Sequence, residues 1–166
     1  MGLDQLILQM MIYITAVSGS FSGELKYDSQ LNDVSKYGTP IVEFTTREKL
    51  FLIKDNRLPM KEEVIEILGL QLGSKIWLKN GWDINDPADQ SILLHELVHY
   101  MQDANGMFYD CMGDKERLAY YIQEKWLEEK HGISIYDAIG LSPLSMVAAM
   151  YCPLPDSYAK PGEGGP

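Results

Sequence analysis

Two histidines four residues apart, with a glutamate directly after the first, constrain the fold of this chain more than any other feature. They stand in the segment His95-Glu96-Leu97-Val98-His99. Asp86 can cap free backbone N–H groups, and Pro87 suits the first position of a helix. Gly106 is a stop signal, so a helix is predicted to end near Ala104. A four-residue step is about 400° on a helix, and both imidazole rings therefore project from nearly the same face.

This pair of rings can chelate one metal ion. Zinc accepts histidine nitrogen at about 2.0–2.1 Å, and a catalytic zinc site needs three protein ligands with a fourth position for water. Glu96 lies about 100° around the helix from His95, where it can take a proton from that water without ligating the ion. The H-E-x-x-H pattern thus predicts His95 and His99 as ligands and Glu96 as general base. The alternative is a pair of half-buried histidines satisfied by neighbouring carboxylates.

The third ligand has to come from another segment. A further helix is predicted from Asp114, as its cap, to His131 and Gly132. Glu116 begins a stripe on this helix, which continues with Tyr120, Gln123 and Leu127. If the two helices run antiparallel, the carboxylate of Glu116 can return to the metal. The alternative is a surface charge that is favourable at a helix N-terminus.

Two aspartates are weaker candidates for the third ligand. Asp103 follows His99 too closely on the same helix, and Asp110 lies in the loop between the helices.

Taken together, these residues resemble a known group of enzymes, the gluzincin-type zinc metallopeptidases, and among them the small single-domain minigluzincins of bacteria. The likeness rests on the run from His95 to Gln102, followed by Glu116-Arg117-Leu118-Ala119-Tyr120, and it covers about residues 77–127 closely. It implies zinc held by His95, His99 and Glu116, with Glu96 as base. It also implies that Lys75–Lys79 is the edge strand of a small sheet, where an extended peptide substrate would pair.

Some positions depart from related patterns. In larger gluzincins an acidic residue four positions after the ligand glutamate supports a histidine from outside the metal site. Tyr120 occupies this position here, so the sequence does not identify the residue that supports the histidine. The metzincin pattern requires glycine three residues after the second histidine and a third histidine six after it. Gln102 and Asn105 occupy those places, so that class is excluded.

Peptide hydrolysis also needs a donor for the negative charge that develops on the carbonyl oxygen. Tyr120 is the first choice as a catalytic, site-lining residue, because it lies on the Glu116 stripe; the alternative is a core tyrosine. Other candidates are Tyr121, His131 and Tyr136; the alternative for His131 is a cation that interacts favourably with the dipole at the end of its helix. Gln102 extends the histidine face by one turn and is expected either to hydrogen-bond a ligand or to line the cleft.

The remaining segments predict an α+β fold, a small zincin-like domain over residues 1–152 with a short mixed sheet. Apolar residues at three- and four-residue steps predict an opening helix that ends near Gly19. Strands are expected at 41–46 and 74–78, and residues 49–54 are expected to extend the first strand or to pair with it. Helices are expected at 60–70 and 143–151, and residues 153–166 are expected to form a flexible tail.

The net charge and the lengths of the apolar stretches limit the kinds of partner that this protein is expected to bind. The 166 residues carry a formal net charge of −10, which disfavours binding to nucleic acid. The apolar stretch from Leu6 to Val17 is shorter than the roughly 20 residues of a membrane span, so no membrane partner is expected. We expect a monomer that acts on a peptide or protein. Its location stays open, since removal of an export signal would imply a periplasmic or secreted protein, and otherwise the cytoplasm.

The two cysteines, Cys111 and Cys152, either form one bridge or remain two small thiols, depending on the compartment.

Three functions follow for testing. The first is a zinc metallopeptidase in which Glu96 activates metal-bound water. The second is a latent or non-catalytic zinc domain whose site is closed by its own tail, through Cys152 or Asp156. The third, a structural domain without metal, requires the histidine pair and Glu116 to be coincidences.

Overall fold

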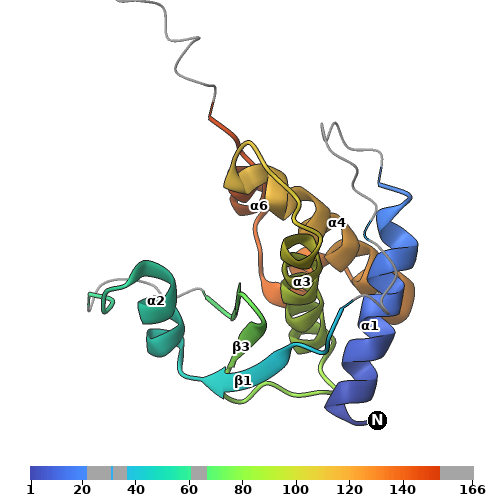
Figure 1. Cartoon of the computed structure of the whole chain (residues 1–166), viewed down its shortest axis with the longest axis horizontal. Coiled ribbons are helices and arrows are strands. Elements are labelled where there is room, and N and C mark those ends of the chain that lie inside the picture. Colours follow the sequence, from blue (N-terminus) through green and yellow to red (C-terminus); the bar gives the residue numbers. More distant parts are fainter. Residues whose placement is uncertain (22–30, 32–36, 61–66, 154–166) are drawn as a thin grey trace, which may run out of the picture.

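A computed structural model describes residues 1–21, 31, 37–60 and 67–153, and within these it has six helices and one three-stranded sheet (Figure 1). Helix α3 (Pro87–Ala104) runs through the middle, with α1 (Leu3–Ser18) on one side and the sheet on the other. Helix α4 (Met112–His131) packs along α3. The core joins apolar side chains of α1, α3, α4 and the central strand, so the H-E-x-x-H helix is held on several sides. The expected α+β class is confirmed.

The sheet is mixed, as expected, but its strand order differs from the prediction. Strand β3 (Lys75–Lys79) lies between β1 (Ile41–Thr45), to which it is parallel, and β2 (Gly69–Leu72), to which it is antiparallel. The expectation that Lys75–Lys79 is an edge strand is therefore wrong, because neighbouring strands already use its backbone hydrogen bonds on both sides. Among the described residues, the unpaired edges of the sheet belong to β1 and β2.

Local signals placed the long helices well. Helix α1 ends at Ser18 with Gly19 as its C-cap, next to the predicted end. At the start of α3 the Asp86 carboxylate accepts a hydrogen bond from the Ala88 N–H at 2.9 Å, and Pro87 is the first residue. Helix α4 begins three residues earlier than predicted, with Cys111 rather than Asp114 at the cap position. It ends at Gly132, which adopts a left-handed conformation with φ 68°.

Two predictions between β1 and β3 are wrong. Residues expected to form or extend a strand make helix α2 (Arg47–Asp55), because the Thr46 hydroxyl caps it by accepting from the Lys49 N–H at 3.3 Å. Asn56, at φ 54°, ends it. The helix expected over 60–70 falls partly on residues 61–66, outside the described part. Its last two residues belong to β2, where Gly69 packs directly against α3.

The C-terminal part adds two short helices. Helix α5 (Ile135–Ile139) was not predicted, although Ser134 caps it by accepting from the Asp137 N–H at 3.2 Å. Helix α6 (Pro143–Ala149) was predicted, to within two residues at its end. The expected tail, 153–166, lies outside the described residues apart from Pro153.

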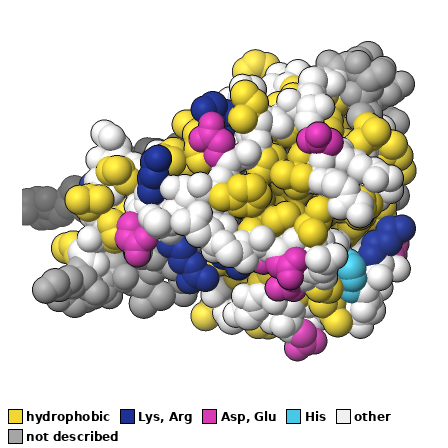
Figure 2. Space-filling model, turned by 90° about the horizontal axis from the view of Figure 1, so that it is seen from below, with side chains coloured by type: hydrophobic (Ala, Val, Ile, Leu, Met, Phe, Trp, Pro, Cys, Tyr) yellow, Lys and Arg dark blue, Asp and Glu magenta, His cyan; other side chains and the backbone are white. Residues whose placement is uncertain are grey.

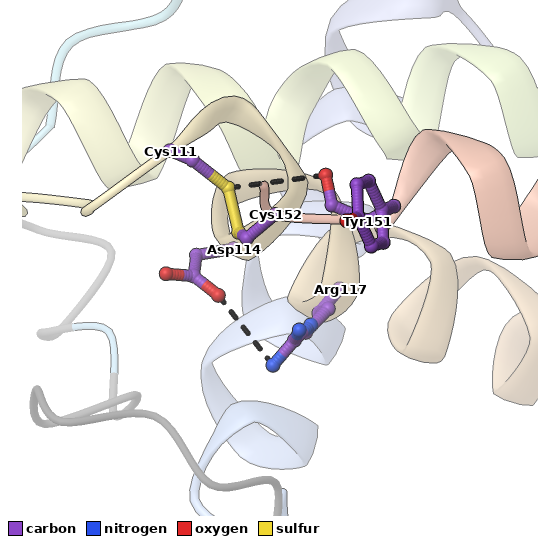
Figure 3. Close-up of a disulfide and its surroundings, with 5 residues drawn as sticks. All are labelled: Cys111, Asp114, Arg117, Tyr151 and Cys152. Atoms are coloured by element: carbon purple, nitrogen blue, oxygen red, sulfur yellow. Dashed lines mark hydrogen bonds and ion pairs between the residues drawn. A yellow bond between two sulfur atoms is a disulfide. The ribbon is translucent and has the colours of Figure 1, made fainter. Parts of the chain in front are cut away.

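A disulfide joins Cys111 to Cys152, with the two Cα atoms 5.8 Å apart (Figure 3). It attaches the segment after α6 to the start of α4, beside the Asp114–Arg117 ion pair. Gly113 makes this close approach feasible, because a Cβ there would lie 2.6 Å from the Tyr151 carbonyl oxygen. Of the two alternatives for the cysteines, the structure contains the bridge.

Among the described residues, every helix is too short or too polar to cross a bilayer. Figure 2 shows one face of the molecule, on which hydrophobic side chains gather at the centre. The lysine and arginine side chains on that face stand apart from one another and are interspersed with acidic ones, so this face carries no continuous basic surface.

Candidate metal centre

Three predicted ligands from two helices converge on one point. His95 and His99 project from α3, and Glu116 projects from the second turn of α4, which runs antiparallel to α3. The Nε2 atoms of the two histidines lie 3.0 Å apart. The carboxylate of Glu116 lies 3.0 Å from Nε2 of His95 and 3.3 Å from Nε2 of His99. The proximity of Glu116 to the histidine pair, expected from the sequence, is thus observed.

The spacing of these atoms fits a small tetrahedral cation. Bonds of about 2.0–2.1 Å in a tetrahedral arrangement separate the ligand atoms by about 3.3–3.4 Å, close to the distances found here. Two imidazole nitrogens and one carboxylate are also a donor set that zinc accepts in catalytic sites. The residues present therefore fit zinc.

The charges of the ligand residues are coupled. Burial opposes the charged form of Glu116, but hydrogen bonds from His95 and His99 and their positive charge hold the pKa of this carboxyl well below its usual range. Burial likewise opposes the charged form of His95. The hydrogen bond to Glu116 and the negative charges of Glu96 and Glu116 outweigh it and raise the pKa of this imidazole.

Glu96 faces a cleft of about 850 Å³ beside the ligands. Its side chain is 8% exposed, and within the described part of the chain its carboxylate accepts no hydrogen bond and forms no ion pair. The walls come from α2, the start of β2, α3, α4 and the segment from α5 to α6. A carboxylate without a partner at the floor of an open cleft is available to accept a proton from water or substrate.

Tyr120 lines the same cleft. Its ring meets the ring of His95 edge-on, with centroids 4.8 Å apart. Burial, together with the negative charges of Glu116 and Glu96, raises the pKa of Tyr120 to about 12. The phenol therefore stays protonated at neutral pH and keeps a hydrogen to donate.

Each histidine has a buried glutamine on its outer side. Nδ1 of His99 lies 2.8 Å from Oε1 of Gln102, and Nδ1 of His95 lies 2.9 Å from Oε1 of Gln123. Gln102 hydrogen-bonds His99, a predicted metal ligand, and it is not among the described residues that line the cleft. The support of His95 by Gln123 was missed, although Gln123 lies on the Glu116 stripe, seven residues after the ligand. Gln123, and not Tyr120, holds the ring of His95 by a hydrogen bond.

Other candidates do not reach the centre. Asp103 forms an ion pair with Lys115 at 2.8 Å instead. His131, at the end of α4, lies 3.2 Å from the amide oxygen of Gln90. A second hollow, of about 670 Å³, lies along α1, and Asp4 is the one carboxylate among its described lining residues. Its described lining residues include no histidine or cysteine and carry no comparable chemistry.

Comparison with known families assigns the chain to one of them. A family model described as Domain of unknown function (DUF6647) matches residues 25–141. The chain belongs to this family. No curated protein and no solved structure matches it.

The DUF6647 domain contains the whole candidate centre. Strands β1 to β3, helix α3 and helix α4 lie inside the matched residues, whereas α1, α6 and Cys152 lie outside them. The cleft is thus built mainly within the DUF6647 domain, with part of one wall added by Ser142 and Ser145 beyond it.

A second group of ligand-type atoms in this DUF6647 protein comprises Cys111, Asp114 and Cys152. Because its two sulfur atoms are bonded to each other, it offers no thiolate to a metal. The same bond corrects one expectation for latency, since Cys152 has no free thiol with which to close the His95–His99–Glu116 centre. Asp156, the other residue considered for that role, lies outside the described residues.

Proposed function

We propose that this protein is a zinc-dependent metallopeptidase with a gluzincin-like site in a small zincin-like domain. The observation that carries the proposal is the convergence of His95, His99 and Glu116 within 3.0–3.3 Å, at a cleft into which the unpaired carboxylate of Glu96 opens. A structural domain has no need for a buried carboxylate without a partner, because burying such a group costs free energy.

In this proposal His95, His99 and Glu116 hold the zinc. When bound, zinc would supply a Lewis acid that polarises the scissile carbonyl and makes water more acidic. Glu96 takes a proton from the attacking water and delivers it to the nitrogen of the leaving amine. The absence of a hydrogen bond to Glu96 from the described residues leaves both carboxylate oxygens free for this transfer.

Tyr120 is suited to stabilise the negative charge on the carbonyl oxygen. It lines the cleft, and with its pKa raised to about 12 its hydroxyl stays protonated well above neutral pH. A hydroxyl that donates only to the developing oxyanion lowers the barrier without strengthening binding of the ground state.

The free edge of β2 is the place where we propose that an extended peptide pairs. Strand β3 has no free edge, whereas the outer side of β2 is unpaired within the described residues. Strand β2 also begins next to the centre, because Gly69 lies against Glu96 and lines the cleft. A peptide paired there would run past the general base.

The test combines metal analysis with hydrolysis of an unstructured protein. Protein purified without added zinc is expected to contain about one zinc per chain, and it should cleave the substrate. Glu96→Ala should keep the metal and lose the cleavage, because the ligands are intact and the base is gone. Glu128→Ala, at an exposed position on α4, is the matched control and should cleave normally. Full cleavage by Glu96→Ala would refute the mechanism.

A further inference from the structure

The two glutamines beside the histidines are buried almost completely, with Gln102 0% and Gln123 2% exposed. A glutamine amide has an oxygen that accepts and a nitrogen that donates. Which of the two faces a histidine is therefore decided by the group at the other end of the amide.

For Gln102 that group is a backbone carbonyl. Nε2 of Gln102 donates to the carbonyl oxygen of Lys115 at 3.1 Å, and a carbonyl can only accept. The amide oxygen must then face His99, where it lies 2.8 Å from Nδ1. An oxygen acceptor at this position requires Nδ1 to carry the hydrogen.

For Gln123 the same conclusion follows through one more residue. The Ser91 hydroxyl donates its single hydrogen to the Ala88 carbonyl oxygen at 2.8 Å, so it accepts from Nε2 of Gln123 at 3.1 Å. The amide oxygen of Gln123 is thereby turned to His95, 2.9 Å from Nδ1. Both chains of hydrogen bonds end on backbone carbonyls, which cannot reverse their role.

We propose that Gln102 and Gln123 are positioning residues that keep His99 and His95 protonated on Nδ1, so that both Nε2 lone pairs point to the metal. The inference rests on the proposed function. Both residues act as neutral amides, so they add no negative charge to a site that already holds the carboxylates of Glu96 and Glu116. Two further buried charges would each carry a desolvation cost.

The two positions differ in what a carboxylate would meet. In Gln102→Glu an acceptor would face the Lys115 carbonyl, so a hydrogen bond is lost and repulsion replaces it. In Gln123→Glu the new carboxylate would meet the Ser91 hydroxyl, which can turn and donate to it. If these residues position the histidine rings, glutamate at position 123 should leave zinc binding stronger than glutamate at position 102.

The experiment measures zinc affinity by competition with a chromophoric chelator. Gln102→Met and Gln123→Met keep the size of the side chain and remove the acceptor, and each should bind zinc about 10–100-fold more weakly than the wild type. Gln123→Glu should bind more tightly than Gln102→Glu. Gln90→Met is the matched control, because Gln90 lies on α3 and contacts His131 outside the centre; its affinity should not change.

Nitrogen-15 NMR of the histidine rings gives a readout that does not depend on activity. Hydrogens on Nδ1 of both rings, protected from exchange with solvent, are expected in the metal-free and the zinc-loaded protein. Methionine variants with wild-type affinity, or a bare Nδ1 on either ring of the wild type, would overturn the positioning role. A wild type that takes up no zinc but shows both Nδ1 hydrogens would refute the proposed function and support the positioning. If the methionine variants fail to fold, the proposal is tested by the zinc affinities of Gln102→Glu and Gln123→Glu and by the nitrogen-15 spectra of the wild type.

Discussion

Gly69 on β2 lies directly against Glu96 on α3. A Cβ on Gly69 would lie 3.0 Å from Cγ and 3.0 Å from Oε1 of Glu96, and 2.9 Å from Cγ2 of Ile92. Because these distances are shorter than ordinary van der Waals contact, the missing side chain is what lets the strand and the carboxylate lie together. Strand β2 and the proposed general base are thus in contact.

We therefore expect Gly69→Ala to displace Glu96. Catalysis should fall by about 10–100-fold in kcat, because misplacement of a reacting group by about 1 Å has a cost of this order. Zinc affinity should stay near the wild-type value, since the atoms nearest to the new Cβ belong to Ile92 and Glu96 and not to a ligand. The measurement is steady-state hydrolysis together with zinc titration. Gly38→Ala is the control, because Gly38 is exposed and its Cβ would lie 4.0 Å from the nearest atom, the Tyr100 hydroxyl oxygen. Equal kcat for the two variants would contradict the expectation.

Replacement of Tyr120 by phenylalanine tests the proposed oxyanion donor. The ring contact with His95 is kept, so folding and zinc content should not change. We expect kcat to fall by about 100-fold with little effect on KM, as for other single donors to an oxyanion. Steady-state kinetics on one peptide measures both constants. A change in KM alone would instead indicate that Tyr120 binds substrate.

The coupled charges of Glu116 and His95 predict how stability of the metal-free protein depends on pH. Despite burial, the pKa of Glu116 lies below the ordinary 4.5, so its contribution is present above 4.5 and is lost as pH falls through the folded value. Despite burial, the pKa of His95 lies above the ordinary 6.5, so its contribution is present below 6.5 and is lost as pH rises through the folded value.

The pair should therefore stabilise the metal-free protein most between about pH 4.5 and 6.5. Urea unfolding of chelator-treated protein at a series of pH values measures the effect. In Glu116→Gln the maximum in this interval should flatten, because the ion pair is gone. A pH profile identical in the two proteins would show that the pair contributes nothing.

The disulfide should stabilise the fold. It closes a loop with a sequence separation of 41, for which the chain-entropy model gives about 4 kcal/mol in free energy of unfolding. A Cys111→Ser/Cys152→Ser double variant should unfold at a lower temperature than the wild type, and reductant should lower the Tm of the wild type only. If reductant leaves the wild-type Tm unchanged, the bridge contributes no stability.

Much of the candidate centre could be predicted from the sequence, because its determinants are local. The four-residue spacing of His95 and His99 depends only on helix geometry. The bounds of α3 follow from Asp86, Pro87 and Gly106, whose effects act within one turn. The position of Glu116 required one assumption about tertiary structure, namely that the next helix runs antiparallel to α3. A connection of a few residues between α3 and α4 favours that arrangement.

Elements without strong local signals were predicted less well. The segment Leu50-Phe51-Leu52-Ile53 is apolar throughout, so its pattern does not distinguish a strand from a helix, and it became part of α2. Gly69 and Leu70 look like the end of a helix in the sequence, but they belong to a strand because glycine at 69 allows close packing on α3.

The sequence by itself determined the two imidazoles, the carboxylate beside them and the helix that carries them, because spacing and capping act over a few residues. Only the tertiary structure decided that β3 is the central strand, that β2 faces Glu96, and that Gln123 orients His95. These relationships join residues distant in the chain. They depend on which surfaces pack together and which buried polar groups find partners, and a local pattern does not contain that information.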